Sequence, residues 1–357
     1  MKTRLGWLAG GFWIVVGACP PADAQGDAWR SLIQQADALY QQGRYDPAAA
    51  AAAKALEVAE GDLGAEHPDV ATSLNLLALV YRTKGEYRAA EPLYKRSLAI
   101  MEKVLGAEHH SVAIAIGNLA ELYQAQGRHA EAERLFRRAL GNVERALGPN
   151  HPNVATWLNN LAELHYAQGQ FAAAQPLYER ALSIRERALG PYNPAVAASL
   201  NNLAALYRAR NEYAAAEPLY RRSLDIAVRR LGQDHPAVAV ALNNLGELYG
   251  AQGQYAQAEL MHLRSLSLVE KSLGPEHPEL DASLNYLAGL YAAQRQYVAA
   301  EHFYRRALGL REKHLGPDHA LVASALESIS RLYRVMGRLD DAKRLAERAA
   351  KIRERPR

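Results

Sequence analysis

The chain has 357 residues, of which 49% are hydrophobic and 22% charged, and its formal net charge is +4. This composition is typical of an ordinary folded protein. Lysine and arginine alternate with glutamate instead of gathering in blocks, so the basic balance indicates a solvated surface and not a surface for polyanions. We therefore expect no nucleic-acid partner.

Residues 1–24 have the pattern of a signal peptide. Lys2 and Arg4 precede an apolar run over residues 5–18, which is short for a membrane span but suits a signal-peptide core. The small residues at 22–24 favour cleavage after Ala24, whereas residues 16–19 resemble a bacterial lipobox that ends at Cys19. We expect the first and hence an exported, periplasmic or secreted protein. A lipidated Cys19 is the alternative that would bind the membrane, and an uncleaved anchor is a third.

Cys19 is the only cysteine of the chain. Cleavage after Ala24 would leave a mature protein without a thiol, which excludes disulfide bonds and thiol catalysis.

A Leu-Gly pair recurs every 42 residues without insertion, and an alanine recurs with the same period. Such a period predicts a stack of similar units. The glycines of these pairs are Gly64, Gly106, Gly148, Gly190, Gly232, Gly274 and Gly316. The predicted units are residues 28–63, 68–105, 110–147, 152–189, 194–231, 236–273, 278–315 and 320–355.

Each unit has the pattern of two helices. Leu158, Leu161 and His165 share one helical stripe, and the following segment repeats this spacing with Ala174 and Tyr178. Neither helix can bury its stripe alone, so stability must come from stacking unit on unit. The sequence therefore predicts an all-α solenoid of about eight antiparallel helix pairs, which forms a single domain over residues 28–357.

The segments that join the units carry a glycine where one helix ends and, in most of them, a proline where the next begins. A histidine precedes most of these helix starts, and Asn193 stands in its place in one linker. Because asparagine is a strong N-cap, we expect the imidazoles to cap backbone N–H groups as well. The six histidines are His67, His109, His151, His235, His277 and His319.

The rival interpretation of these histidines is metal binding. Each histidine is a whole unit from the next, and only His109 and His110 are adjacent, with side chains that diverge on a helix start. We therefore predict neither a metal nor another cofactor.

The pattern LGxxHPxVAxxLNNLAxLYxxQGxYxxAxxLYxRAL resembles tetratricopeptide repeats, and its 42-residue period is similar to the kinesin light chain type. The resemblance extends from residue 28 to the C-terminus, although Asn211 and Arg295 replace the glycine between the paired helices. It implies a right-handed superhelix whose first helices line a concave groove that holds extended peptides.

Recurring asparagines and glutamates on the first helices are the candidate groove residues. On a helix, Asn160 and Glu163 point away from the buried stripe, and Asn159 lies on its flank. An amide both donates and accepts hydrogen bonds, which suits a peptide main chain, and the glutamates favour a partner with basic character. The predicted peptide-binding residues are Asn75, Asn118, Asn159, Asn160, Asn201, Asn202, Asn243, Asn244, Asn285, Glu121, Glu163 and Glu247. The alternative is that these asparagines bond to the neighbouring repeat and lock the stack.

Two other features have simpler interpretations. One arginine per unit, in the series Arg96, Arg138, Arg180, Arg222, Arg264, Arg306 and Arg348, is predicted to lie on a solvated outer face. Trp157 stands alone in the middle of the array, where it either contacts a partner or packs on the adjacent helix.

The sequence contains no catalytic motif: G-x-S-x-G, a P-loop and H-E-x-x-H are all missing. We expect a non-catalytic scaffold that binds a protein or peptide partner. The alternative is a structural component of the cell envelope that acts through its convex face or its tips.

Overall fold

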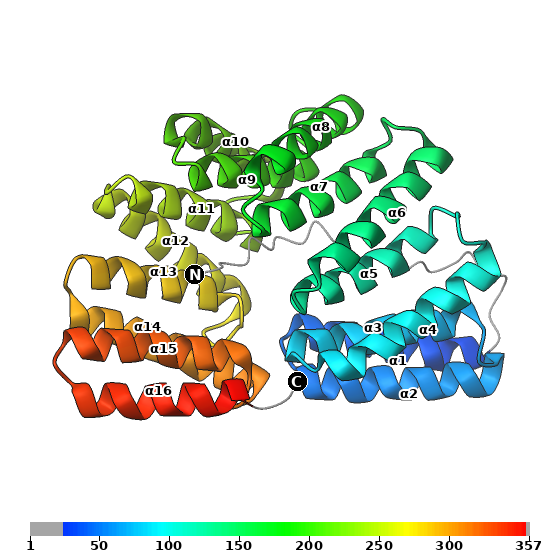
Figure 1. Ribbon diagram of the computed structural model, residues 1–357, viewed down its shortest axis with the longest axis horizontal. Helices are drawn as coiled ribbons and strands as arrows, with labels where there is room; N and C mark the ends of the chain where they lie inside the picture. Colours follow the sequence, from blue (N-terminus) through cyan, green and yellow to red (C-terminus); the bar gives the residue numbers. More distant parts are fainter. Residues whose placement is uncertain (1–23, 355–357) are drawn as a thin grey trace. The chain divides into compact units, whose positions relative to one another are not determined.

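The computed structural model describes residues 24–354 of the chain, and this part consists of sixteen α-helices without a strand (Figure 1). The all-α prediction is confirmed. Residues 1–23, which hold most of the predicted signal peptide and Cys19, lie outside the described part. The chain divides into two compact units, one that ends at Pro191 and one that begins at Tyr192.

The first compact unit contains four helix pairs. They are α1 (Ala24–Gln41) with α2 (Tyr45–Leu63), α3 (Pro68–Lys84) with α4 (Tyr87–Leu105), α5 (Val112–Ala125) with α6 (His129–Leu147), and α7 (Pro152–Ala167) with α8 (Phe171–Leu189).

The second compact unit also contains four pairs. They are α9 (Pro194–Ala209) with α10 (Tyr213–Leu231), α11 (Pro236–Ala251) with α12 (Tyr255–Leu273), α13 (Leu280–Ala293) with α14 (Tyr297–Leu315), and α15 (Ala320–Val335) with α16 (Leu339–Glu354).

Within each unit, the two helices of a pair pack on each other, and the second helix packs on the first helix of the next pair. The predicted stripe is buried, because Leu158 and Ala174 have no exposed surface and Leu161 and His165 have little. Small alanines such as Ala132 and Ala174 are fully buried, so a larger side chain there would have to displace its packed neighbours. The core is therefore a row of similar interfaces.

The linkers between repeats depend on capping side chains, as the sequence predicts. The Nδ1 atom of His151 accepts a hydrogen bond of 3.2 Å from the backbone N–H of Asn153, and the Asn193 side chain accepts one of 2.9 Å from Ala195. The other five linker histidines accept the same bond from the residue two positions on. The capping prediction is confirmed for His67, His151, Asn193, His235 and His319, which directly precede their helices. The helices after His109 and His277 begin three residues later, so these two histidines bond to the linker backbone before the helix start. No group of three metal-binding side chains occurs among the described residues.

The recurring arginines have a role that the sequence analysis missed. Arg138 of α6 donates a bond of 3.1 Å to the carbonyl of Ala107 in the preceding linker and pairs with Glu102 at 2.6 Å. Arg180 makes the equivalent contacts with Pro149 and Glu144. These arginines are partly exposed, as predicted, but their guanidinium groups also join one repeat to the linker before it.

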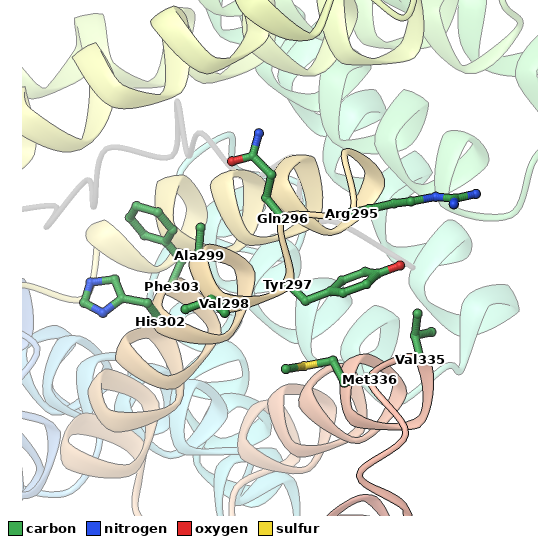
Figure 2. Close-up of a pocket in the computed structure, with 9 residues that line it drawn as sticks. All are labelled: Arg295, Gln296, Tyr297, Val298, Ala299, His302, Phe303, Val335 and Met336. Atoms are coloured by element: carbon green, nitrogen blue, oxygen red, sulfur yellow. The ribbon is translucent and has the colours of Figure 1, made fainter.

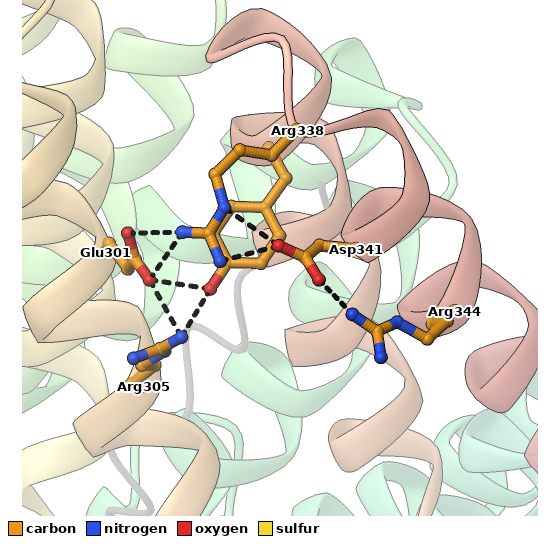
Figure 3. A network of polar contacts seen from close by, with 6 residues as sticks. Glu301, Arg305, Arg338, Asp341 and Arg344 are labelled. Atoms are coloured by element: carbon orange, nitrogen blue, oxygen red, sulfur yellow. Dashed lines mark hydrogen bonds and ion pairs between the residues drawn. The ribbon is translucent and has the colours of Figure 1, made fainter.

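A second contact between repeats recurs at the helix turns. In the last repeats, the hydroxyl of Tyr333 donates a bond of 2.6 Å to Glu301, and Arg338 contacts both Glu301 at 3.2 Å and Asp341 at 2.7 Å (Figure 3). In the first compact unit, Tyr123 and Arg128 make the same contacts with Glu91. These bonds tie the turn of one repeat to the second helix of the repeat before it.

The turn between paired helices allows a stability test. Most repeats have glycine at this left-handed position, but Arg295 adopts it with φ 61° and Asn211 with φ 62°. An arginine pays a steric cost there that glycine avoids, so Arg295→Gly should raise the free energy of unfolding by about 1 kcal/mol. Asn211→Gly, the control, should change it by less, because asparagine tolerates this conformation. Guanidinium chloride denaturation would measure both, and a less stable Arg295→Gly variant would contradict the argument.

Candidate functional site

The candidate site is the surface of the first helices, which we call the first-helix face. It comprises the outward residues of α3, α5 and α7 in the first compact unit and of α9, α11 and α13 in the second. Several first helices of neighbouring repeats contact one another within a compact unit, namely α3 with α5, α9 with α11 and α11 with α13. A side chain on this face therefore lies close to the equivalent position of the next repeat.

The asparagines of the first compact unit differ in their contacts. The amide of Asn118 in α5 reaches the side-chain oxygen of Asn75 in α3 at 3.5 Å, which is a weak bond between repeats. Asn159 is buried, with 6% of its surface exposed. Asn160 is half-buried and makes no side-chain hydrogen bond to the described residues.

In the second compact unit, Asn243 belongs to a buried polar cluster. Its amide nitrogen donates a bond of 2.9 Å to Ser283 in α13, and its oxygen lies 2.9 Å from Nδ1 of His262 in α12. Ser265 bonds to Ser283 at 3.0 Å and to the carbonyl of Ala239 at 2.8 Å. Asn243 thus joins two repeats from inside, as the packing alternative predicts.

The remaining asparagines of this unit do not bond to another described repeat as Asn243 does, and they differ in their burial. Asn285 bonds within its own helix to Asp281, and Asn244 is buried. Asn201 and Asn202 are half-buried. Asn244 is expected to point outward like Asn160, but the structure buries it. Asn159 and Asn243, expected on the flank of the buried stripe, are buried as well.

Asn243 gives a prediction that separates packing from binding. Asn243→Ala should lower the free energy of unfolding by about 1–3 kcal/mol, since it leaves Nδ1 of His262 buried without its partner and removes one of the hydrogen bonds of Ser283. The control is Asn202→Ala, in the preceding repeat and one position further along the helix pattern than Asn243. It should change the free energy of unfolding by no more than about 0.5 kcal/mol. Chemical denaturation would check this, and equal costs for the two variants would refute the assignment.

Glu121 and Glu163 come from neighbouring repeats of the first compact unit. Glu121 in α5 forms an ion pair with Arg82 of α3. Glu163 in α7 makes no ion pair or hydrogen bond to the described residues. Burial, and secondly the nearby charge of Glu121, raises the pKa of Glu163 to about 7. Glu163 is therefore only partly ionised near neutral pH.

Glu247 in α11 is the equivalent carboxylate of the second compact unit. It lies 3.2 Å from Arg208 of α9. Burial raises the pKa of Glu247, while the charge of Arg208 and a hydrogen bond from Tyr286 lower it by less. The three predicted glutamates thus do lie on first helices, but two of them have intramolecular arginine partners that reduce their negative charge.

Trp157 packs inside the repeat stack. Its side chain in α7 has 8% of its surface exposed and lies against Gly117 of α5, where an added Cβ would come within 2.4 Å of the ring. Gly117 occupies the position that asparagine holds in the neighbouring repeats, such as Asn75 and Asn159. The missing side chain makes room for the indole, so the packing interpretation of Trp157 is confirmed.

A hollow on the second compact unit lies away from the first-helix face. It is formed by the turn before α14, the first two turns of α14 and the end of α15, and Figure 2 shows its lining side chains. Val298 and Val335 are 79% and 64% exposed. Both stand where the preceding repeat has alanine, at Ala256 and Ala293. The replacement of alanine by the larger valine at both positions is a feature of the sequence that could have indicated this apolar surface.

None of the described helices is long and apolar enough to cross a membrane.

The family model of the tetratricopeptide repeat matches residues 29–103, 89–145, 111–187, 158–227, 195–271, 237–313 and 279–355. Because these matches cover most of the chain, the protein belongs to the tetratricopeptide repeat family, whose stacked helix pairs are typical of protein–protein interaction scaffolds.

The chain is similar to several solved structures. The chain is similar to BtubC (BKLC) from P. vanneervenii, with 24% identity, a TM-score of 0.50, and coverage of 71% of this chain and 94% of that one. A Rap protein complexed with competence and sporulation factor is 15% identical, with a TM-score of 0.54 and coverage of 92% and 98%. A putative kinesin light chain repeat protein of Podospora anserina is 26% identical over 58% of this chain and 98% of that one, with a TM-score of 0.49. The search of curated proteins finds no match.

Proposed function

We propose that the protein is a non-catalytic scaffold that binds an extended segment of a partner protein along its first-helix face, in the concave groove that a tetratricopeptide array forms. The observation that carries this proposal is that each compact unit has a half-buried amide without a side-chain hydrogen bond to the described residues, Asn160 in the first unit and Asn202 in the second. A peptide main chain offers carbonyl and N–H groups at regular intervals, and amide side chains can bond to both.

The structure of the face makes the binding test specific. Asn160, Asn202 and Asn244 occupy equivalent positions in three successive repeats and make no side-chain hydrogen bond to the described residues. Replacing all three with alanine should therefore remove contacts to a partner at little cost in stability. Asn243, by contrast, is bound within the fold and is unsuitable for this purpose.

The test is a crosslinking pull-down from the native cell envelope with the mature protein, comparing the wild type with the triple variant. Loss of a specific protein with an unchanged melting curve would support the proposal. Recovery of the same proteins by both forms would contradict it and favour the alternative of a structural envelope component that acts through other surfaces.

We further propose that the protein is exported after cleavage following Ala24. The apolar run at residues 5–18 and the small residues at 22–24 support this. The mass of the mature protein checks it, because a lipid-modified Cys19 at the new N-terminus would give a different mass and would contradict this site.

A further inference from the structure

Arginine–glutamate pairs recur on the first-helix face. Arg82 of α3 pairs with Glu121 of α5, and Arg208 of α9 lies 3.2 Å from Glu247 of α11. The spacing along the chain is the same in both, with the arginine 39 residues before the glutamate. The repeat therefore has a defined place in which a guanidinium group of one first helix meets the carboxylate of the next.

Glu163 of α7 is the third carboxylate at this position, but the repeat before it has no arginine in the equivalent place. The residue in the equivalent place on α5 is Gln124. Glu163 accordingly has no ion pair within the described chain, although it is half-buried like Glu121 and Glu247. One repeat thus carries the acidic half of a pair whose basic half is missing.

The charges of the groups around Glu163 favour a positively charged group beside it. Glu121 of α5 adds a second negative charge, which Arg82 of α3 partly offsets. Tyr178 of α8 is near Glu163, and burial, followed by the charge of Glu163, raises the pKa of this phenol, so Tyr178 supplies no charge that offsets the carboxylate. No positive side chain of these helices reaches Glu163, so its charge is uncompensated.

We propose that Glu163 binds a basic side chain of the partner segment, which fills the place that Arg82 and Arg208 occupy in the paired repeats. This inference rests on the proposed function and specifies the chemistry of the partner at one position of the first-helix face. A guanidinium there can form two parallel hydrogen bonds with the carboxylate. The amides bind the main chain of the segment, and Glu163 selects one of its side chains.

Binding of a cation by Glu163 requires the ionised carboxylate. Because burial and the charge of Glu121 raise the pKa of Glu163 to about 7, protons compete with the basic side chain below that pH. The affinity for a cation should therefore weaken by about tenfold between pH 8 and pH 6. Glu121 remains the second carboxylate within reach, and its pair with Arg82 keeps it from replacing Glu163.

The experiment uses the mature protein and the pentapeptide acetyl-Ala-Ala-Arg-Ala-Ala-amide, with a citrulline peptide as the uncharged control. The ¹³C signals of the glutamate carboxyl groups report binding, and the Glu163 signal is assigned from its loss in Glu163→Gln. We expect a saturable shift of this signal with the arginine peptide alone. Equal shifts with both peptides, or none with either, would overturn the inference.

Two variants test the missing partner directly. Gln124→Arg should supply the absent guanidinium from within the chain, lower the pKa of Glu163, and weaken peptide binding at least tenfold. Gln42→Arg adds the same charge at an exposed position of the turn after α1 and should leave binding unchanged. A Gln124→Arg protein that binds the peptide as tightly as the wild type would refute the proposal.

The triple asparagine variant and Glu163→Gln together separate this inference from the proposed function. A partner that is lost with the triple asparagine variant but retained by Glu163→Gln would leave the function intact and overturn the role of Glu163. A peptide that binds at Glu163 while the triple variant keeps every partner would support the cation site and contradict peptide binding by the amides.

Discussion

Glu163→Gln should raise the free energy of unfolding by about 2 kcal/mol at pH 8 and leave it nearly unchanged at pH 4. Burial and the neighbouring Glu121 raise the pKa of Glu163 from 4.5 to about 7 in the folded protein. The folded state therefore holds this proton more tightly than the unfolded chain does. The stability from the protonated carboxyl is complete below pH 4.5 and is lost as the pH rises to about 7. Chemical denaturation across this range, as a difference between wild type and variant, measures the effect.

Arg82→Gln is the matched control for this prediction. It removes the partner of Glu121 and leaves that carboxylate in the situation of Glu163. We expect a loss of about 1–2 kcal/mol at pH 8, opposite in sign to the effect of Glu163→Gln. If both variants were destabilised at pH 8, Glu163 would have a stabilising contact and the assignment of an unpaired carboxylate would be wrong.

Gly316→Ala should lower the free energy of unfolding by about 1–3 kcal/mol. Gly316 ends α14 with φ 83° and ψ 159°, a region that only glycine adopts without strain. An added Cβ would meet no atom within 4 Å, so the cost comes from the backbone alone. Thermal or chemical denaturation of the two proteins measures it.

Gly309→Ala, seven residues earlier, should have the opposite sign. Gly309 lies in the interior of α14, is exposed, and also has no atom within 4 Å of an added Cβ. Alanine is a better helix former, so stability should rise by about 0.5–1 kcal/mol. Losses of equal size at both positions would show that space, and not backbone conformation, governs these glycines.

In some places two contacting residues both differ from the repeat pattern. Such pairs explain part of the buried packing that the sequence did not predict. Gly246 stands where neighbouring repeats have alanine, and His262 stands where they have tyrosine. An added Cβ at Gly246 would come within 2.5 Å of the imidazole, so the two changes compensate each other. Burial lowers the pKa of His262 to about 3, which keeps the ring neutral beside Asn243. A comparison of repeats that sought paired departures would have placed Asn243 in the core.

The sequence by itself determined the helix pairs, the turns and the linker caps, because these depend on contacts between residues close in the chain. The 42-residue period, the glycines such as Gly148 and the capping His151 are local signals of this kind. Only the tertiary structure decided which amides are bound within the fold and which glutamates have partners. Asn243 and Glu121 bond to residues about one repeat away, and those distances depend on how repeats pack. Of the three predicted glutamates, Glu163 alone has no ion pair to the described residues, and this depends on which side chain the neighbouring repeat places beside it.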